Sequence, residues 1–130
     1  MPYYFSKIVE GVSFDAMVDK VVGALKAEGF GVLTEIDVKA TMKQKIGVEF
    51  RPYRILGACN PALAHRALTA EDKIGTMLPC NVIIQDHGTG RVEVAAINPR
   101  ASMEAIGNPA LAAIAAEVAA KLERVIAQLG

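Results

Sequence analysis

The sequence predicts a single α+β domain, residues 1–130, in which a mainly antiparallel sheet carries two long helices on one face. The first observation is the element order, which hydrophobic periodicity gives as strand, helix, four strands with short helical insertions, and helix. The second is the length, because 130 residues suffice for one hydrophobic core but not for two. The third is the lack of regular strand–helix alternation and of a G-x-G-x-x-G motif after a strand, which disfavours a Rossmann fold.

The N-terminal part of the chain predicts a strand, a long helix and a second strand. The first strand covers residues 3–9, and Ser13 follows as a typical helix N-cap. Apolar residues then recur every three or four positions until Gly29, a pattern that favours a helix with one face on a sheet. A second strand is expected over residues 30–37, and a short helix is expected within residues 37–47, where Gly47 ends it.

Three further strands are expected in the middle of the chain. The first covers residues 53–58 and leads into a helix that Asn60 caps and Pro61 begins. The strand over residues 80–85 contains a continuous Val-Ile-Ile run, which is typical of a central, fully covered strand. A polar, glycine-rich turn then predicts a hairpin with the strand over residues 91–97.

The terminal helix is expected from Pro109 to about Leu129, with Asn108 as its cap. Its apolar stripe consists of Leu111, Ile114, Ala115, Val118, Leu122, Val125, Ile126 and Leu129. Its flank of small residues consists of Ala112, Ala113, Ala116, Ala119, Ala120 and Ala127. A flank of this kind either contacts another protein element closely or merely raises helix propensity on an exposed face.

Composition and charge exclude several classes of protein. The formal net charge of zero offers no field to attract nucleic acid or an anionic membrane, and no apolar run is long enough to span a bilayer. The N-terminus lacks the layout of a signal peptide, so we expect a cytoplasmic protein with reduced cysteines. With glycine counted and tyrosine left out, the apolar share is about 58%, against roughly 45–50% in ordinary domains, which favours a homodimer.

An internal similarity marks the candidate site. Cys59-Asn60 ends one predicted strand and Cys80-Asn81 begins the next, each beside a proline. Antiparallel pairing would bring the two thiols together, whereas parallel pairing would separate them by about 20 Å. Three interpretations of the thiols are open: they are buried structural residues, part of a ligand or soft-metal site, or redox-active groups.

The asparagines and histidines have simpler interpretations. Asn60 is expected to cap its helix, whereas Asn81 precedes a strand and is the better candidate for contact with a ligand. His65 and His87 have no serine and carboxylate array beside them, so a hydrolase triad has no support. The pattern identifies neither a catalytic residue nor a cofactor nor a particular metal.

Three segments resemble one known family, the domain of unknown function number 302. They are residues 35–41 (EIDVKAT), 53–61 (YRILGACNP) and 74–82 (IGTMLPCNV), and the resemblance spans nearly the whole chain. It implies a β-α-β4-α fold of the TATA-binding-protein-like type and a homodimer, but no established reaction. A fold of that type does not imply DNA binding, because this chain has no excess of basic residues.

These features lead to one functional hypothesis and two alternatives. We expect a homodimeric binding module in which Cys59, Asn60, Cys80 and Asn81 lie near a pocket for a small ligand or a soft metal. The first alternative is a thiol-dependent sulfur-transfer or redox enzyme, in which one cysteine is the nucleophile and the other resolves the intermediate. The second is a purely structural component of an assembly.

Overall fold

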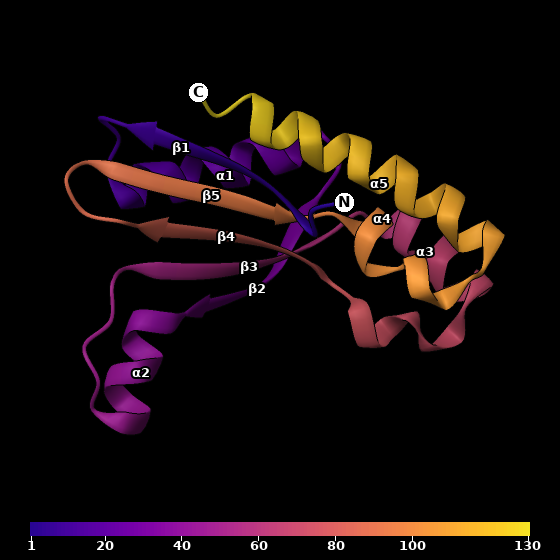
Figure 1. Ribbon diagram of the computed structural model, residues 1–130, viewed down its shortest axis with the longest axis horizontal. Helices are drawn as coiled ribbons and strands as arrows, with labels where there is room; N and C mark the ends of the chain where they lie inside the picture. Colours follow the sequence, from indigo (N-terminus) through magenta and orange to yellow (C-terminus); the bar gives the residue numbers. More distant parts are fainter.

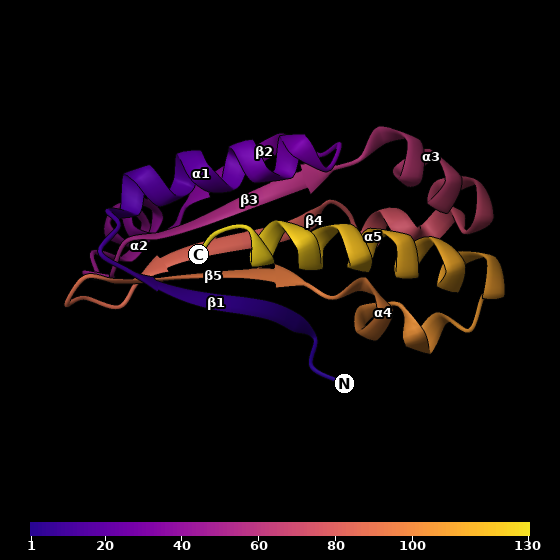
Figure 2. The same cartoon turned by 90° about the horizontal axis from the view of Figure 1, so that it is seen from above.

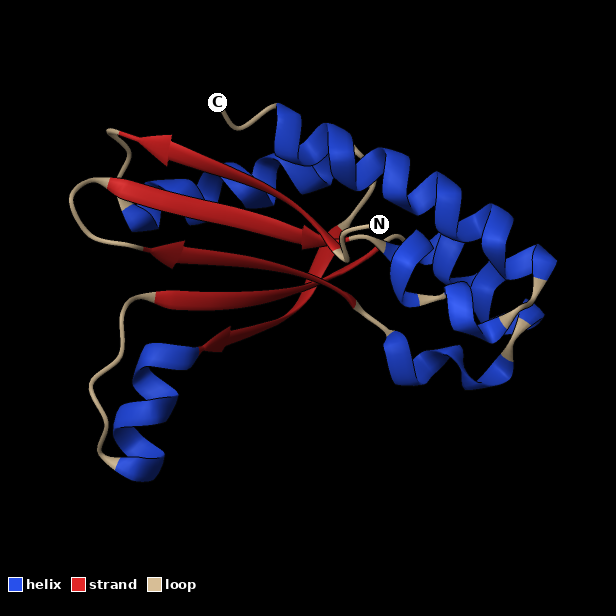
Figure 3. Cartoon of the chain, in the orientation of Figure 1, coloured by secondary structure: helices blue, strands red, loops and turns tan.

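The computed structural model describes residues 1–130 and confirms the predicted order of strands and long helices (Figures 1 and 3). The elements in chain order, with η for a 3-10 helix, are β1 (Tyr4–Glu10), α1 (Phe14–Ala27), β2 (Gly31–Asp37), α2 (Val38–Ile46), β3 (Tyr53–Cys59), α3 (Pro61–Ala70), η1 (Asp72–Met77), β4 (Cys80–Asp86), β5 (Arg91–Ile97), α4 (Pro99–Ser102), η2 (Glu104–Ile106) and α5 (Pro109–Ala127). No helix is both long and apolar enough to cross a membrane.

The five strands form one open antiparallel sheet in the order β1-β5-β4-β3-β2. β4 is therefore the central strand, as its apolar run predicts. α1 and α5 both cover the same face of the sheet, and alternate side chains of β4 and β5 are buried beneath them (Figure 2). The other face carries no long helix. We refer to it as the open face, and its apolar side chains include Ile8, Ile36, Ile55, Ile83 and Ala95.

Side-chain caps explain where the helices begin. The Ser13 hydroxyl accepts a hydrogen bond from the Ala16 amide at 3.1 Å, as the sequence predicts for the start of α1. Asn60 and Asn108 act in the same way at α3 and α5, where each is followed by a proline. α4 was not predicted, although Asn98 before Pro99 repeats this Asn-Pro signal. With only four residues, α4 is too short to show a helical periodicity.

A cluster of short helices lies beyond one end of the sheet. α3, η1, α4 and η2 gather beside the N-terminal half of α5, while α1 and the C-terminal half of α5 cover the sheet itself (Figures 1 and 2). α2 lies apart, beside the β2 edge. The strands and the helical cluster therefore meet at the β3–α3 junction and at the start of β4.

The two faces of α5 differ in burial. All eight residues of the predicted apolar stripe are buried. Within the alanine flank, Ala119 is fully buried by the chain itself, whereas Ala112, Ala113 and Ala116 are exposed. The close contact that small residues permit is therefore intramolecular at Ala119, and only the remainder of the flank is free for a partner.

Candidate functional site

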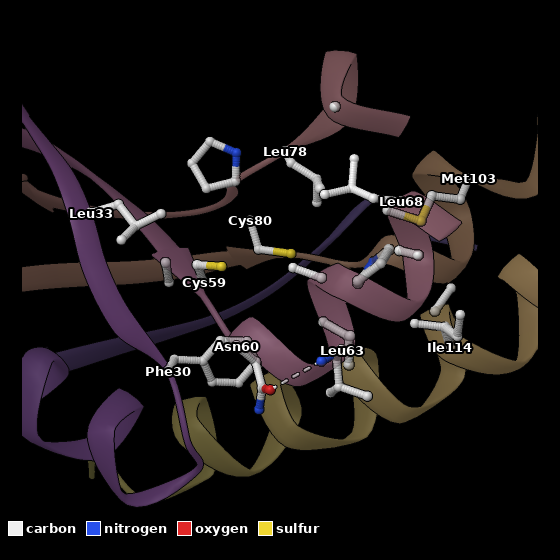
Figure 4. A pocket seen from close by; sticks show the side chains of 18 residues that line it. Phe30, Leu33, Cys59, Asn60, Leu63, Leu68, Leu78, Cys80, Met103 and Ile114 are labelled. Atoms are coloured by element: carbon white, nitrogen blue, oxygen red, sulfur yellow. Dashed lines mark hydrogen bonds between the residues drawn. The ribbon is translucent and has the colours of Figure 1, made fainter. Parts of the chain in front are cut away.

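A cavity of about 320 Å³ lies where the sheet meets the helical cluster (Figure 4). Its wall comes from parts of the chain that are far apart in sequence: the start of β2, the β3–α3 junction, the segment from η1 to β4, the α4 region and α5. Phe30, Leu63, Leu78, Met103 and Ile114 represent these parts in the wall. The helical cluster forms one side of the cavity, and the strand ends form the other.

The wall of this cavity is apolar and carries no charge. Of its 18 lining residues, 14 are hydrophobic, and none is Asp, Glu, Lys, Arg or His. Asn60 is the one amide side chain among them, and its Oδ1 is occupied by the Leu63 amide at 3.3 Å. Helix capping, the simpler interpretation of Asn60 in the sequence, is thus confirmed. A bound molecule would meet carbon and sulfur almost everywhere.

The two cysteines contribute the sulfur atoms of the wall. β3 and β4 pair antiparallel with Ala58 opposite Cys80, so Cys59 lies one register step beyond this pair. Strict strand alternation would send neighbouring side chains to opposite faces, but Cys59 ends its strand and Cys80 begins the next. Both residues line the cavity, and Figure 4 shows both sulfur atoms turned toward it. The antiparallel pairing that brings these residues together is confirmed.

The thiols differ in accessibility. Cys59 is half-buried, whereas Cys80 is 8% exposed, and both are free of disulfide bonds. Burial raises the pKa of the Cys80 thiol from 9.0 to about 11, and the neighbouring Cys59 contributes a smaller increase. Cys80 therefore stays protonated at neutral pH. No histidine or carboxylate in the wall is available to remove its proton.

The expectation that Asn81 lines the same pocket is wrong. Asn81 pairs with Gly57 within the β4–β3 ladder, and its side chain alternates to the open face while Cys80 and Val82 are buried on the other. Asn81 is exposed and is not among the residues that line the cavity. The repeated Cys-Asn pairs are adjacent in sequence, but strand periodicity separates the members of the second pair.

A polar network at the opposite end of the sheet was not predicted. Glu93 Oε1 accepts a hydrogen bond from Gln85 Nε2 at 3.2 Å and lies 2.8 Å from His87 Nε2. Gln85 Oε1 in turn accepts a hydrogen bond from Arg51 Nε at 2.9 Å. No group of three or more His, Cys, Asp or Glu side chains is arranged to hold a metal ion. The register that places Gln85 opposite Glu93 explains this network, and no single-strand pattern contains it.

Comparisons with known proteins agree with the fold. The family model described as "Domain of unknown function DUF302" matches residues 5–129. Among solved structures, the chain is similar to an uncharacterized conserved protein DUF302 from Bacillus stearothermophilus, with 26% sequence identity, a TM-score of 0.89 and 98% of each chain covered. No curated protein matches the chain. The family resemblance found in the sequence and its α+β fold are thereby confirmed.

Proposed function

Because the chain belongs to the DUF302 family, which is described only as a domain of unknown function, we propose a role from its cavity: binding of a small, uncharged, mainly apolar molecule. The observation that carries this proposal is the combination of about 320 Å³ of space with a wall that holds no charged residue. Pockets for small molecules start at about 300 Å³ and are mostly apolar. The cavity fits the lower end of that range.

The wall also indicates the chemistry of the ligand. A charged molecule would lose its hydration on entry and would meet no counter-charge, which disfavours carboxylates, phosphates and ammonium groups. Met103, Cys59 and Cys80 supply polarisable sulfur, which makes favourable contacts with aromatic rings. We therefore favour a neutral molecule with an aromatic or unsaturated part.

The same features rank the other candidate functions below this one. A thiol-dependent enzyme needs a thiolate, but burial raises the pKa of Cys80 and the wall supplies no base. A soft metal would also need deprotonated thiols, and only the Met103 thioether could supplement them in this wall. A purely structural role gives no reason for the chain to keep the cavity unfilled.

The test uses two probes of matched shape, benzyl alcohol and benzoate, titrated into ¹⁵N-labelled protein. Benzyl alcohol is expected to cause saturable shifts at amides around the cavity, and benzoate is not. Ala64→Phe places a ring in the cavity wall and should abolish the shifts, whereas Ala113→Phe on the exposed side of α5 should leave them unchanged. Equal responses to both probes, or shifts that survive a folded Ala64→Phe variant, would reject the proposal.

The homodimer expected from the sequence is also part of this proposal, with the open face as the contact surface. Tyr4, Ile8 and Ile36 are 42%, 45% and 46% exposed and lie on this face with Ile55 and Ile83 between the edge strands. In a monomer these side chains form exposed apolar surface, and they become the core of an interface when a second sheet covers them. The apolar surplus of the composition is consistent with this arrangement.

A further inference from the structure

We propose that Cys59 and Cys80 form a dithiol switch, in which peroxide converts the pair into an intramolecular disulfide at the wall of the cavity. The switch would regulate the site of the proposed function, so its effect on binding rests on that function. Formation of the disulfide does not rest on the proposed function, because it depends only on the two side chains and their strands.

The strand register supplies the geometry. Ala58 lies opposite Cys80, so the Cα atoms of Cys59 and Cys80 are one strand spacing and one residue apart. A spacing of about 4.8 Å and a rise of about 3.3 Å per residue give a Cα separation of about 6 Å. Disulfides join Cα atoms that are about 4.4–6.8 Å apart, so the backbone separation of the two cysteines lies within the required range.

The direction of the side chains supplies the second observation. Both cysteines line the same cavity, and the two sulfur atoms turn toward it from neighbouring strand ends (Figure 4). The two thiols interact electrostatically, since Cys59 contributes to the raised pKa of Cys80. No other cysteine exists in the chain, so an intramolecular disulfide has only one form.

The difference in burial assigns the order of the two steps. Half-buried Cys59 meets peroxide first: its thiolate attacks one peroxide oxygen, the O–O bond breaks, and Cys59 becomes a sulfenic acid. The hydroxide that leaves takes up the proton that the Cys59 thiol had released and becomes the first water. The fraction of Cys80 that has released its proton to solvent then attacks the Cys59 sulfur as a thiolate. The S–O bond breaks, and the hydroxide that leaves takes up that proton to give a second water. Two thiols are oxidised and one peroxide is reduced to two waters.

The consequence for the cavity follows from where the bond forms. A disulfide would fix the end of β3 to the start of β4 and draw two wall atoms together. The wall would lose both S–H groups and change its shape beside Leu78 and Leu33, which line the same region. Oxidation is therefore expected to weaken binding of benzyl alcohol several-fold, and a dithiol reductant should restore it.

The decisive experiment counts thiols and masses after treatment with hydrogen peroxide. The wild-type chain should lose two hydrogen atoms and both free thiols while remaining a single chain under denaturing conditions. Cys80→Ser should accumulate a Cys59 sulfenic acid that dimedone traps, because the resolving sulfur is gone. Cys59→Ser should react at least about tenfold more slowly than Cys80→Ser, because only the buried thiol remains.

Two results would overturn the switch. One is oxidised wild-type protein whose chains are joined by intermolecular disulfides. The other is dimedone capture of Cys59 in the wild type at the same level as in a folded Cys80→Ser variant, since Cys80 would then not resolve the intermediate. Failure of benzyl alcohol to bind the reduced protein would reject the proposed function but leave the thiol count as the test of the disulfide.

Discussion

Gly57 in β3 and Thr34 in β2 lie so close together on the open face that a side chain on the glycine would force its neighbours to move. A Cβ atom on Gly57 would clash with Thr34 Oγ1 and would lie 2.7 Å from Pro79 Cγ. Pro79 borders the cavity and directly precedes Cys80. The close packing of these three residues therefore holds the start of β4 against β3, where the two thiols lie.

Gly57→Ala is expected to destabilise the protein by about 1–3 kcal/mol, because overpacking forces Thr34 and Pro79 to move. Gly23→Ala is the matched control. A Cβ on Gly23 meets nothing within 4 Å, and alanine in place of glycine within α1 should stabilise the fold by about 0.5–1 kcal/mol. Urea unfolding measures the change in the free energy of unfolding for both variants, and changes of the same sign would contradict this account.

The stability of the protein should fall at high pH because of Cys80. Its pKa of about 11 in the folded state exceeds the ordinary value of 9.0, so the unfolded chain releases this proton first. The contribution is fully present below pH 9 and is lost as the pH rises through 11, a loss of about 2–3 kcal/mol for a shift of this size. Comparison of wild type with Cys80→Ala by urea unfolding at several pH values isolates this group. Parallel pH profiles for the two proteins would show that burial of Cys80 has no such effect.

The dimer surface can be tested with two lysine substitutions. Ile36→Lys puts a charge on the open face at a side chain that is already 46% exposed, so the fold itself should tolerate it. It is expected to convert dimer into monomer in sedimentation equilibrium, whereas Ala116→Lys on α5 should not. The reverse pattern would place the interface on the alanine flank, which the sequence leaves open as a possible contact surface.

Asn81→Ala should leave binding of benzyl alcohol unchanged within about twofold, because Asn81 lies on the other side of the sheet from the cavity. The same titration applied to Leu63→Ala should show altered affinity, since Leu63 is buried in the cavity wall. A strong loss of binding in Asn81→Ala would mean that the probe binds on the open face instead.

The sequence predicted the elements well because their signals are local. Ser13, Asn60 and Asn108 each combine a cap with the following periodicity, and the apolar run around Ile83 marked the central strand. Antiparallel pairing of the strands that hold Cys59 and Cys80 was the favoured of two topologies. That single choice decided whether the thiols would meet.

The cavity itself could not be predicted, because its wall is a product of tertiary structure. Phe30 and Val118 both line it, yet nothing in their local sequences relates them. Asn81 was misplaced for the opposite reason: it is adjacent to Cys80 in sequence, but the pleat of the strand puts the two side chains on opposite faces of the sheet. The cytoplasmic location and the dimer remain predictions.

Since the wall draws on residues from Phe30 to Val118, the cavity is assembled only when almost the entire chain has folded. No fragment of the protein would keep it, and an occupant would add its full binding free energy to the folded state alone. At a hundredfold excess over its dissociation constant, that gain is about 2.7 kcal/mol, comparable with the loss caused by one poorly tolerated mutation. The abundance of the protein in a cell would then follow the supply of its ligand.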